Sequence, residues 1–245
     1  MTLSAKAFQR WLQGIAPDAS TADVCRVSGI KRTTLAQQLV RGKVSVSTVV
    51  SISRAYNINP VSALGEFEAY RVLAGPPQPP TRCELVSQVS TADLLRAVLA
   101  RPAMGAFGRE EAAPAPLSPA PHATSVKNWV DAIDDGEVRH RVSAATGIAP
   151  QNYSAQLTAN RLTPELAVAT ALAAGVGPAG GLVATGLVTE EEAGWPPGAR
   201  QDALDSMSDG DLTALAGDRL QALGKVLRRQ EQDQAQTEKI WENLG

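Results

Sequence analysis

The sequence predicts an all-α protein in which two similar helical units follow each other along the chain. Aromatic residues are scarce, with three Phe, three Tyr and four Trp among 245 residues. The core must therefore be built from Ala, Val, Leu and Ile, which suits small helical bundles better than a β-sandwich. The chain also repeats itself without a gap. The tryptophan at position 11 recurs as Trp129, and the glycine at position 29 recurs as Gly147, in both cases 118 residues later. Such a repeat indicates a duplicated unit of about a hundred residues.

The first expected helix covers residues 8–15. Phe8, Trp11, Leu12 and Ile15 recur there at the spacing of one helix face. We expect Trp11 to anchor the core rather than to contact a ligand, because it lies on this apolar face.

A helix-turn-helix motif is predicted next. Residues 21–27 form a short helical run, Gly29 supplies the backbone that a tight turn needs, and a second helix runs toward Gly42. Leu35 and Leu39 are four residues apart and share one face of this second helix. The opposite face carries small and hydrogen-bonding side chains that suit the edges of bases in a DNA major groove: Arg32, Thr33, Ala36, Gln37 and Val40.

Two further helices are expected downstream. Ser45 can cap a helix that carries Val46, Val49, Val50 and Ile52, and a turn at residues 57–60 precedes another helix over residues 61–69. The alternation over residues 44–47 is too short to predict a sheet. The stretches TTLAQQLVRGKVS and VVSISRAYNINPVSAL, within this order of five short helices, resemble the lambda-repressor-like helix-turn-helix proteins. The resemblance is closest to the immunity repressors of temperate actinobacterial phages and covers about the first seventy residues. This chain departs from the wider family in having Cys25 where alanine is usual and one extra residue before Gly42.

The resemblance implies a sequence-specific repressor that acts by occupying an operator in double-stranded DNA. Arg32, Thr33, Ala36 and Gln37 would contact bases, whereas Lys31, Thr34, Arg41 and Lys43 would hold phosphates. The charge distribution agrees with this expectation although the whole chain has a net charge of −2. Residues 1–73 contain nine Lys and Arg residues but only four Asp and Glu residues, and the rest of the chain has a net negative charge.

The remaining boundaries follow from composition. We predict an N-terminal helix-turn-helix domain over residues 1–73, and a Pro-rich connector with an accessory helix over residues 74–101. A Pro/Ala-rich linker follows over residues 102–124. Residues 125–219 repeat residues 7–101 as a second helix-turn-helix-like domain, and a C-terminal helix occupies residues 220–245.

The second copy keeps the pattern of the motif but loses its basic charge. Five of its side chains are tentative DNA contacts: Gln151, Asn152, Ser154, Gln156 and Arg161. Asp131, Asp134, Asp135 and Glu137 crowd the preceding region and would weaken attraction to DNA. Two interpretations therefore stay open, a second DNA reader and a copy that serves packing or self-association.

Other classes of function find little support. Cys25, Cys83, His122 and His140 show no metal-ligand spacing, and we expect neither a metal, a cofactor nor a catalytic residue. The apolar run over residues 166–188 is broken by glycines and a proline, so two short buried helices are expected there rather than a membrane span. Without a signal-like N-terminus, a cytoplasmic, nucleoid-associated protein is expected. The alternative function is a helical protein-protein interaction or architectural protein whose second domain or C-terminal helix mediates self-association.

Overall fold

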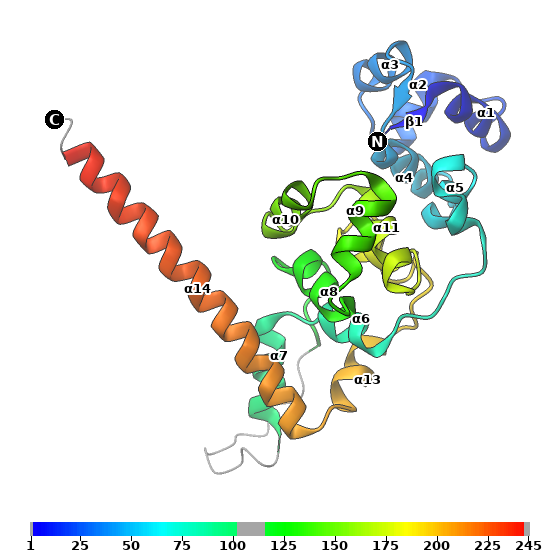
Figure 1. The fold of residues 1–245 in the computed structure, drawn as a ribbon. Coiled ribbons are helices and arrows are strands. Elements are labelled where there is room, and N and C mark those ends of the chain that lie inside the picture. The colour runs from blue at the N-terminus through cyan, green and yellow to red at the C-terminus, as the bar shows by residue number, and fades with distance from the viewer. Residues whose placement is uncertain (1, 102–115, 243–245) are drawn as a thin grey trace. The chain divides into compact units, whose positions relative to one another are not determined.

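The computed structural model describes residues 2–101 and 116–242, with side chains as far as Ala235 and at Thr237 (Figure 1). It is all-α, as predicted. By contacts the chain divides into two units. Unit 1 comprises Met1–Gln88 and Pro119–Ala199, and unit 2 comprises Val89–Ser118 and Arg200–Gly245. The predicted accessory region 74–101 is therefore shared between the units, and the predicted linker falls mostly outside the described residues.

The first module, residues 2–74 of unit 1, holds five α-helices and a 3₁₀ helix. They are α1 (Ala5–Ile15), α2 (Thr21–Ser28), α3 (Arg32–Val40), α4 (Val46–Ala55), α5 (Pro60–Gly65) and η1 (Glu68–Ala74). Serine side chains cap the N-termini of α2 and α4. Ser20 accepts a hydrogen bond from the amide of Asp23, and Ser45, as expected, accepts one from that of Thr48, both at 3.2 Å.

A small β-ribbon in this module was not predicted from the sequence. Strand β1 (Leu3–Ser4) pairs antiparallel with β2 (Lys43–Val44), with Leu3 opposite Val44. Both side chains are buried. Burial of this pair offsets the shortness of the strands and fixes the N-terminal residues beside the end of α3.

The second module comprises residues 119–199 of unit 1. Its helices are α8 (Ser125–Ile133), α9 (Val138–Thr146), α10 (Pro150–Thr158), α11 (Pro164–Ala174) and α12 (Gly180–Ala184). The bounds of α3 and α10 differ by the 118 residues of the sequence repeat at both ends. Descent of the two modules from one duplicated unit stays a prediction. The apolar run over residues 166–188 forms the separate helices α11 and α12, and no helix in the described part of the chain is both long and apolar enough to cross a membrane.

One helix of the connector region belongs to the second module by packing. Helix α6 (Arg82–Ser87) lies against α8. Glu84 is buried there, and its Oε1 accepts a hydrogen bond of 3.2 Å from Nε1 of the fully buried Trp129. The covering helix of the second module thus comes from the stretch that follows the first module in sequence.

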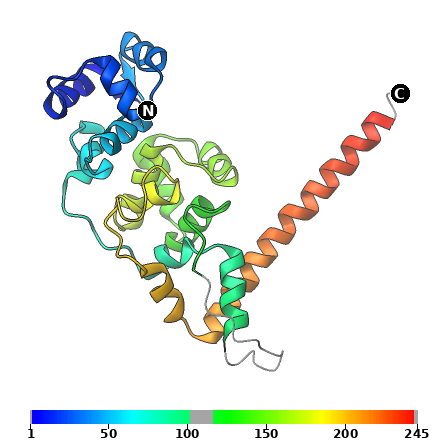
Figure 2. The ribbon, with the colours of Figure 1, turned by 180° about the vertical axis from the view of Figure 1, so that it is seen from behind.

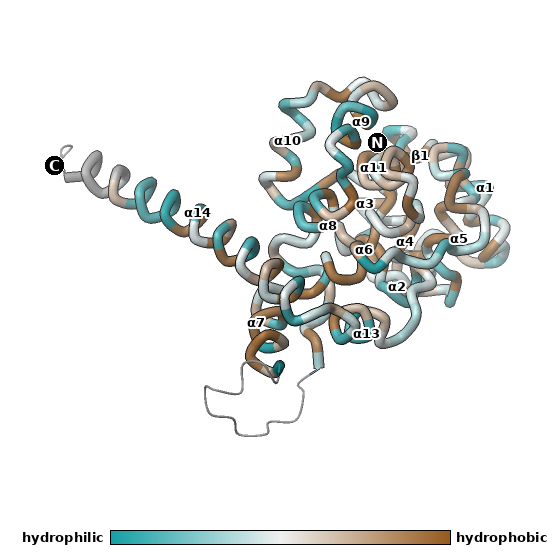
Figure 3. Tube along the Cα trace, turned by 60° about the horizontal axis from the view of Figure 1, so that its bottom comes forward, coloured by the Kyte–Doolittle hydropathy of each residue, from teal (hydrophilic) through white to brown (hydrophobic). Residues whose placement is uncertain are grey.

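Unit 2 is a small helical assembly made of α7 (Thr91–Ala100), α13 (Ala199–Asp205) and α14 (Asp209–Glu242). Its core consists of Val89, Leu94, Leu204 and Leu212. Helix α7 lies beside the first turns of α14, as Figures 1 and 2 show. The predicted C-terminal helix is therefore the continuation of a helix that begins at Asp209. Apolar side chains of this helix are exposed between residues 220 and 227, and its described residues from Arg228 onward are almost all polar (Figure 3).

Candidate nucleic-acid interface

The turn between α2 and α3 has the geometry that the sequence motif predicts. Gly29 ends α2 in the left-handed conformation, with φ of 69° and ψ of 9°, which a side chain would disfavour. Val24, Cys25 and Leu35 are buried beneath the turn. The helix α3 is thereby fixed by its apolar side, and Cys25 packs beneath it as a small buried residue.

The opposite side of α3 is open to solvent. All eight sequence-predicted DNA contacts of this module are exposed: Lys31, Arg32, Thr33, Thr34, Ala36, Gln37, Arg41 and Lys43. Val40 continues the same surface and is 89% exposed. We call these nine residues the α3 face. It combines a cationic start, short side chains in the middle and a cationic end.

The cations of the α3 face are available to an external anion. Lys31, Arg32, Arg41 and Lys43 have no ion-pair partner within the described ranges. Elsewhere in the first module, Arg26 pairs with Asp23, Arg54 with Glu192 and Arg71 with Glu68. Lys6 and Arg10 of α1 also have no ion pair in the described part of the chain. Four of the six cations of this module that lack one therefore lie on α3 and its two ends.

Gln38, which was not predicted from the sequence as a functional residue, holds the end of α3 in place. Oε1 of Gln38 accepts hydrogen bonds from the amide of Ser45 and the hydroxyl of Thr48, both at 3.0 Å. This side chain thus ties α3 to the start of α4. The signal was present in the repeat, because Gln156 occupies the equivalent position.

Replacement of Gln38 by alanine tests this role. Gln38→Ala leaves the half-buried Ser45 amide without its acceptor and should lower the free energy of unfolding by about 1–2 kcal/mol. Chemical denaturation measures the loss. Gln37→Ala, one residue earlier on the exposed face, is the matched control and should stay within about 0.5 kcal/mol of wild type. A similar loss in both variants would contradict the role of Gln38.

The second module presents a comparable but less basic helix. Gln151, Asn152, Ser154 and Arg161 are exposed, as a DNA contact requires. Gln156 is half-buried, and its Oε1 accepts a hydrogen bond of 3.2 Å from the amide of Thr163. It therefore repeats the supporting contact of Gln38, and its carbonyl oxygen is committed to the fold.

The acidic residues before this helix are largely neutralised. Arg139 pairs with Asp131 at 2.9 Å and with Asp134 at 3.0 Å, and Arg141 pairs with Asp135 at 3.0 Å. Hydrogen bonds from the backbone of Glu137 and from Arg141 lower the pKa of Asp135 below its ordinary value. The repulsion of DNA expected from the sequence is thus partly offset by neighbouring arginines.

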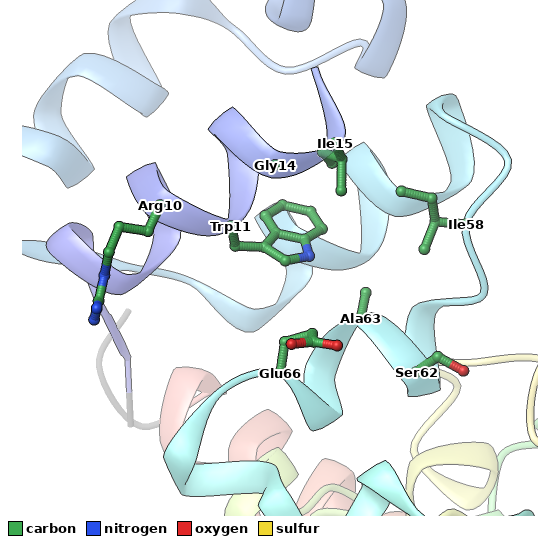
Figure 4. Close-up of a pocket in the computed structure, with 8 residues that line it drawn as sticks. All are labelled: Arg10, Trp11, Gly14, Ile15, Ile58, Ser62, Ala63 and Glu66. Carbon is green, nitrogen blue, oxygen red and sulfur yellow. The ribbon is translucent and has the colours of Figure 1, made fainter. Parts of the chain in front are cut away.

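A pocket of about 350 Å³ lies away from the α3 face, between α1 and α5 (Figure 4). Eight residues line it: Arg10, Trp11, Gly14, Ile15, Ile58, Ser62, Ala63 and Glu66. Trp11 is only half-buried, which corrects its interpretation as a core anchor. Its ring packs against Phe8 and Phe67, with centroids 5.8 Å apart in both pairs. In the second module the equivalent Trp129 is covered by α6, whereas no described helix covers Trp11 in this way.

No group of His, Cys, Asp and Glu that could hold a metal ion occurs among residues 2–101 and 116–242. Comparisons with protein-family models, curated proteins and solved structures found no match for this chain. The α3 face, with its geometry and charge, is therefore the feature of this chain that indicates a function.

Proposed function

We propose that this protein is a sequence-specific DNA-binding transcriptional repressor, of the phage immunity type, that acts by occupying its operator. The exposed α3 face with four cations lacking ion-pair partners in the described part of the chain carries the proposal. In a major groove, Arg32 can donate two hydrogen bonds to guanine, and Gln37 can both donate to and accept from adenine. Lys31, Thr34, Arg41 and Lys43 can bind phosphates on either side. A protein with this function works in the cytoplasm on the nucleoid.

We further propose that the second module contacts DNA through Gln151, Asn152, Ser154 and Arg161. The exposure of these side chains and the ion pairs at Asp131, Asp134 and Asp135 support this assignment. Because the two faces differ in sequence, a single chain would recognise an asymmetric site with two unlike halves. Gln156 contributes mainly to the local fold in this proposal.

The salt dependence of binding tests the proposal. The full chain should select a sequence from a pool of random duplexes, and its affinity for that sequence should fall steeply with salt. Three cationic phosphate contacts alone predict a slope of about −3 in log K against log salt concentration. Fluorescence anisotropy at several salt concentrations measures the slope. A flat response, or failure to select any sequence, would contradict DNA reading.

Self-association is the second candidate function. Leu220, Leu223 and Leu227 of α14 are nearly half exposed and recur at helical spacing, which favours contact with another helix. Sedimentation of the full chain without DNA distinguishes the candidates. An oligomer that binds no DNA would favour the protein-interaction function.

A further inference from the structure

The two modules of unit 1 are joined by contacts in addition to the chain itself. Arg54 of α4 donates from Nε and from its terminal nitrogen to the two carboxylate oxygens of Glu192, at 2.6 and 2.7 Å. It also donates to the carbonyl of Leu187 at 3.1 Å. Such a bidentate ion pair fixes the relative orientation of the two side chains as well as the distance between them. The hydrogen bonds from Arg54 also lower the pKa of the Glu192 carboxyl, which keeps the pair ionised at neutral pH.

Two more hydrogen bonds join the modules at separate points. Asn59 caps α5 with its carbonyl oxygen, and its amide nitrogen donates to the backbone carbonyl of Glu192 at 2.8 Å. The hydroxyl of the buried Tyr70 donates to Oε1 of Glu165 on α11 at 2.6 Å. We call the contacts of Arg54 and Asn59 with Glu192, and of Tyr70 with Glu165, the bracing contacts.

The connector is also packed against the second module. A Cβ added to Gly194 would lie 2.8 Å from Cβ of Pro77, and one added to Gly177 would lie 3.3 Å from Cβ of Gln78. Prolines stiffen this stretch. At its end, Thr81 and Glu84 form a capping box that starts α6, and Glu84 accepts the hydrogen bond from Trp129. From Arg54 to Glu84 the chain is therefore held to the second module at several successive points.

We propose that the bracing contacts and the packed connector fix the distance between α3 and α10, and so make the protein selective for the number of base pairs between the two halves of its site. This inference rests on the proposed function of both modules. A flexible tether tolerates many separations of two half-sites because its ends explore a broad range of distances. A rigid connection does not. Five added base pairs move the second half-site by about half a helical turn, to the opposite side of the duplex. Arg54 and Glu192 act here as positioning residues.

Binding to altered spacings tests this inference. The probe is the two-part duplex that the full wild-type chain selects from a random pool, together with derivatives carrying two or five inserted base pairs and with each half alone. For wild type, five inserted base pairs should lower affinity at least tenfold. In the double variant Glu192→Ala, Tyr70→Phe, affinity for the native spacing should fall, and the penalty for insertion should shrink below threefold. Affinity for each half alone should not decrease.

The sign of the charge change makes the test specific. Glu192→Ala removes a negative charge and, by electrostatics alone, should raise affinity for DNA. Glu68→Ala removes the same charge from an exposed pair with Arg71, which does not join the modules. It should retain the full spacing penalty. The inference would be overturned if the double variant and Glu68→Ala both lost the spacing penalty, or if neither lost it.

The glycine contacts offer an independent pair of variants. Gly194 and Gly198 share a φ of 77°, so alanine is strained to a similar extent at both. Only at Gly194 would the new methyl group meet Pro77, whereas nothing lies within 4 Å at Gly198. Gly194→Ala should therefore weaken the spacing preference and Gly198→Ala should preserve it.

A measurement without DNA separates failure of this inference from failure of the proposed function. Spin labels at positions 33 and 152, in a chain with both native cysteines replaced by serine or alanine, report the distance between α3 and α10. Pulsed electron paramagnetic resonance measures the distribution of this distance. Wild type should give a narrow distribution and the double variant a broad one. A broad distance distribution in the wild type overturns the inference whatever the result of the DNA-binding experiment. Equal affinity for all spacings, or selection of a site with a single half, overturns it while DNA reading stands. If no duplex is selected, the proposed function and the spacing selectivity fail together.

Discussion

Arg32→Ala is expected to remove most of the sequence preference of this protein for DNA. Arg32 begins α3, is exposed, and has no ion-pair partner in the described part of the chain. A bidentate contact between arginine and guanine contributes about 1–3 kcal/mol of discrimination between bases. Its removal in Arg32→Ala should therefore lower specific affinity roughly 5- to 150-fold. Anisotropy titrations with the selected duplex and with a scrambled duplex measure the ratio of specific to nonspecific binding.

Arg26→Ala provides the matched control for this prediction. It removes the same charge from α2, where Arg26 is exposed and pairs with Asp23 at 3.4 Å. Binding to both duplexes should weaken slightly and by the same factor. Gln151→Ala reports on the second module, because a loss of specific affinity there would support its role as a DNA reader. If Arg32→Ala lowered binding to both duplexes equally, Arg32 would bind phosphate and not a base.

Trp129→Ala is expected to have the largest effect on stability. Trp129 is fully buried between α6 and the helices of the second module, and its ring nitrogen donates to Glu84. Truncation would leave a large cavity and a buried carboxylate without one of its donors, at a cost of about 3–5 kcal/mol in unfolding free energy. Denaturant titration followed by far-ultraviolet circular dichroism measures this loss.

Trp11→Ala is the natural comparison, because the repeat places Trp11 at the equivalent position of the first module. Trp11 borders an open pocket, so part of its surface is already in water and its truncation should cost clearly less. Equal losses at the two positions would show that the difference in burial has no energetic consequence.

Much of the fold could be predicted from the local sequence. Serine caps, the left-handed glycine at the helix-turn-helix motif and the spacing of Leu35 and Leu39 act within a few residues, and the structure has them as expected except for helix ends. The exposure of the DNA-contact candidates on α3 follows from the same spacing. The assignment of these residues to DNA stays a prediction.

The contacts between distant segments could not be predicted in this way. Glu84 and Trp129 are 45 residues apart, and nothing in the amphipathic pattern of either helix identifies its partner. One signal lay in the repeat, where Gly180 and Gly181 stand at the positions of Ser62 and Ala63. A Cβ at Gly180 would clash with Oε1 of Glu84, so the second module has glycines where α6 packs. The same difference explains why Trp11 is half-exposed although Trp129 is buried.

Because α6 packs on α8, the second module begins earlier in the chain than the sequence repeat indicates. In sequence the copies part at the Pro/Ala-rich linker over residues 102–124, but the helix that covers Trp129 lies before that linker. A fragment that began at the linker would therefore lack this cover and expose an indole and the surrounding apolar surface. A fragment that began within residues 75–80 would include α6. The shortest piece of chain that can bury Trp129 thus begins at the short proline run and not at the longer linker.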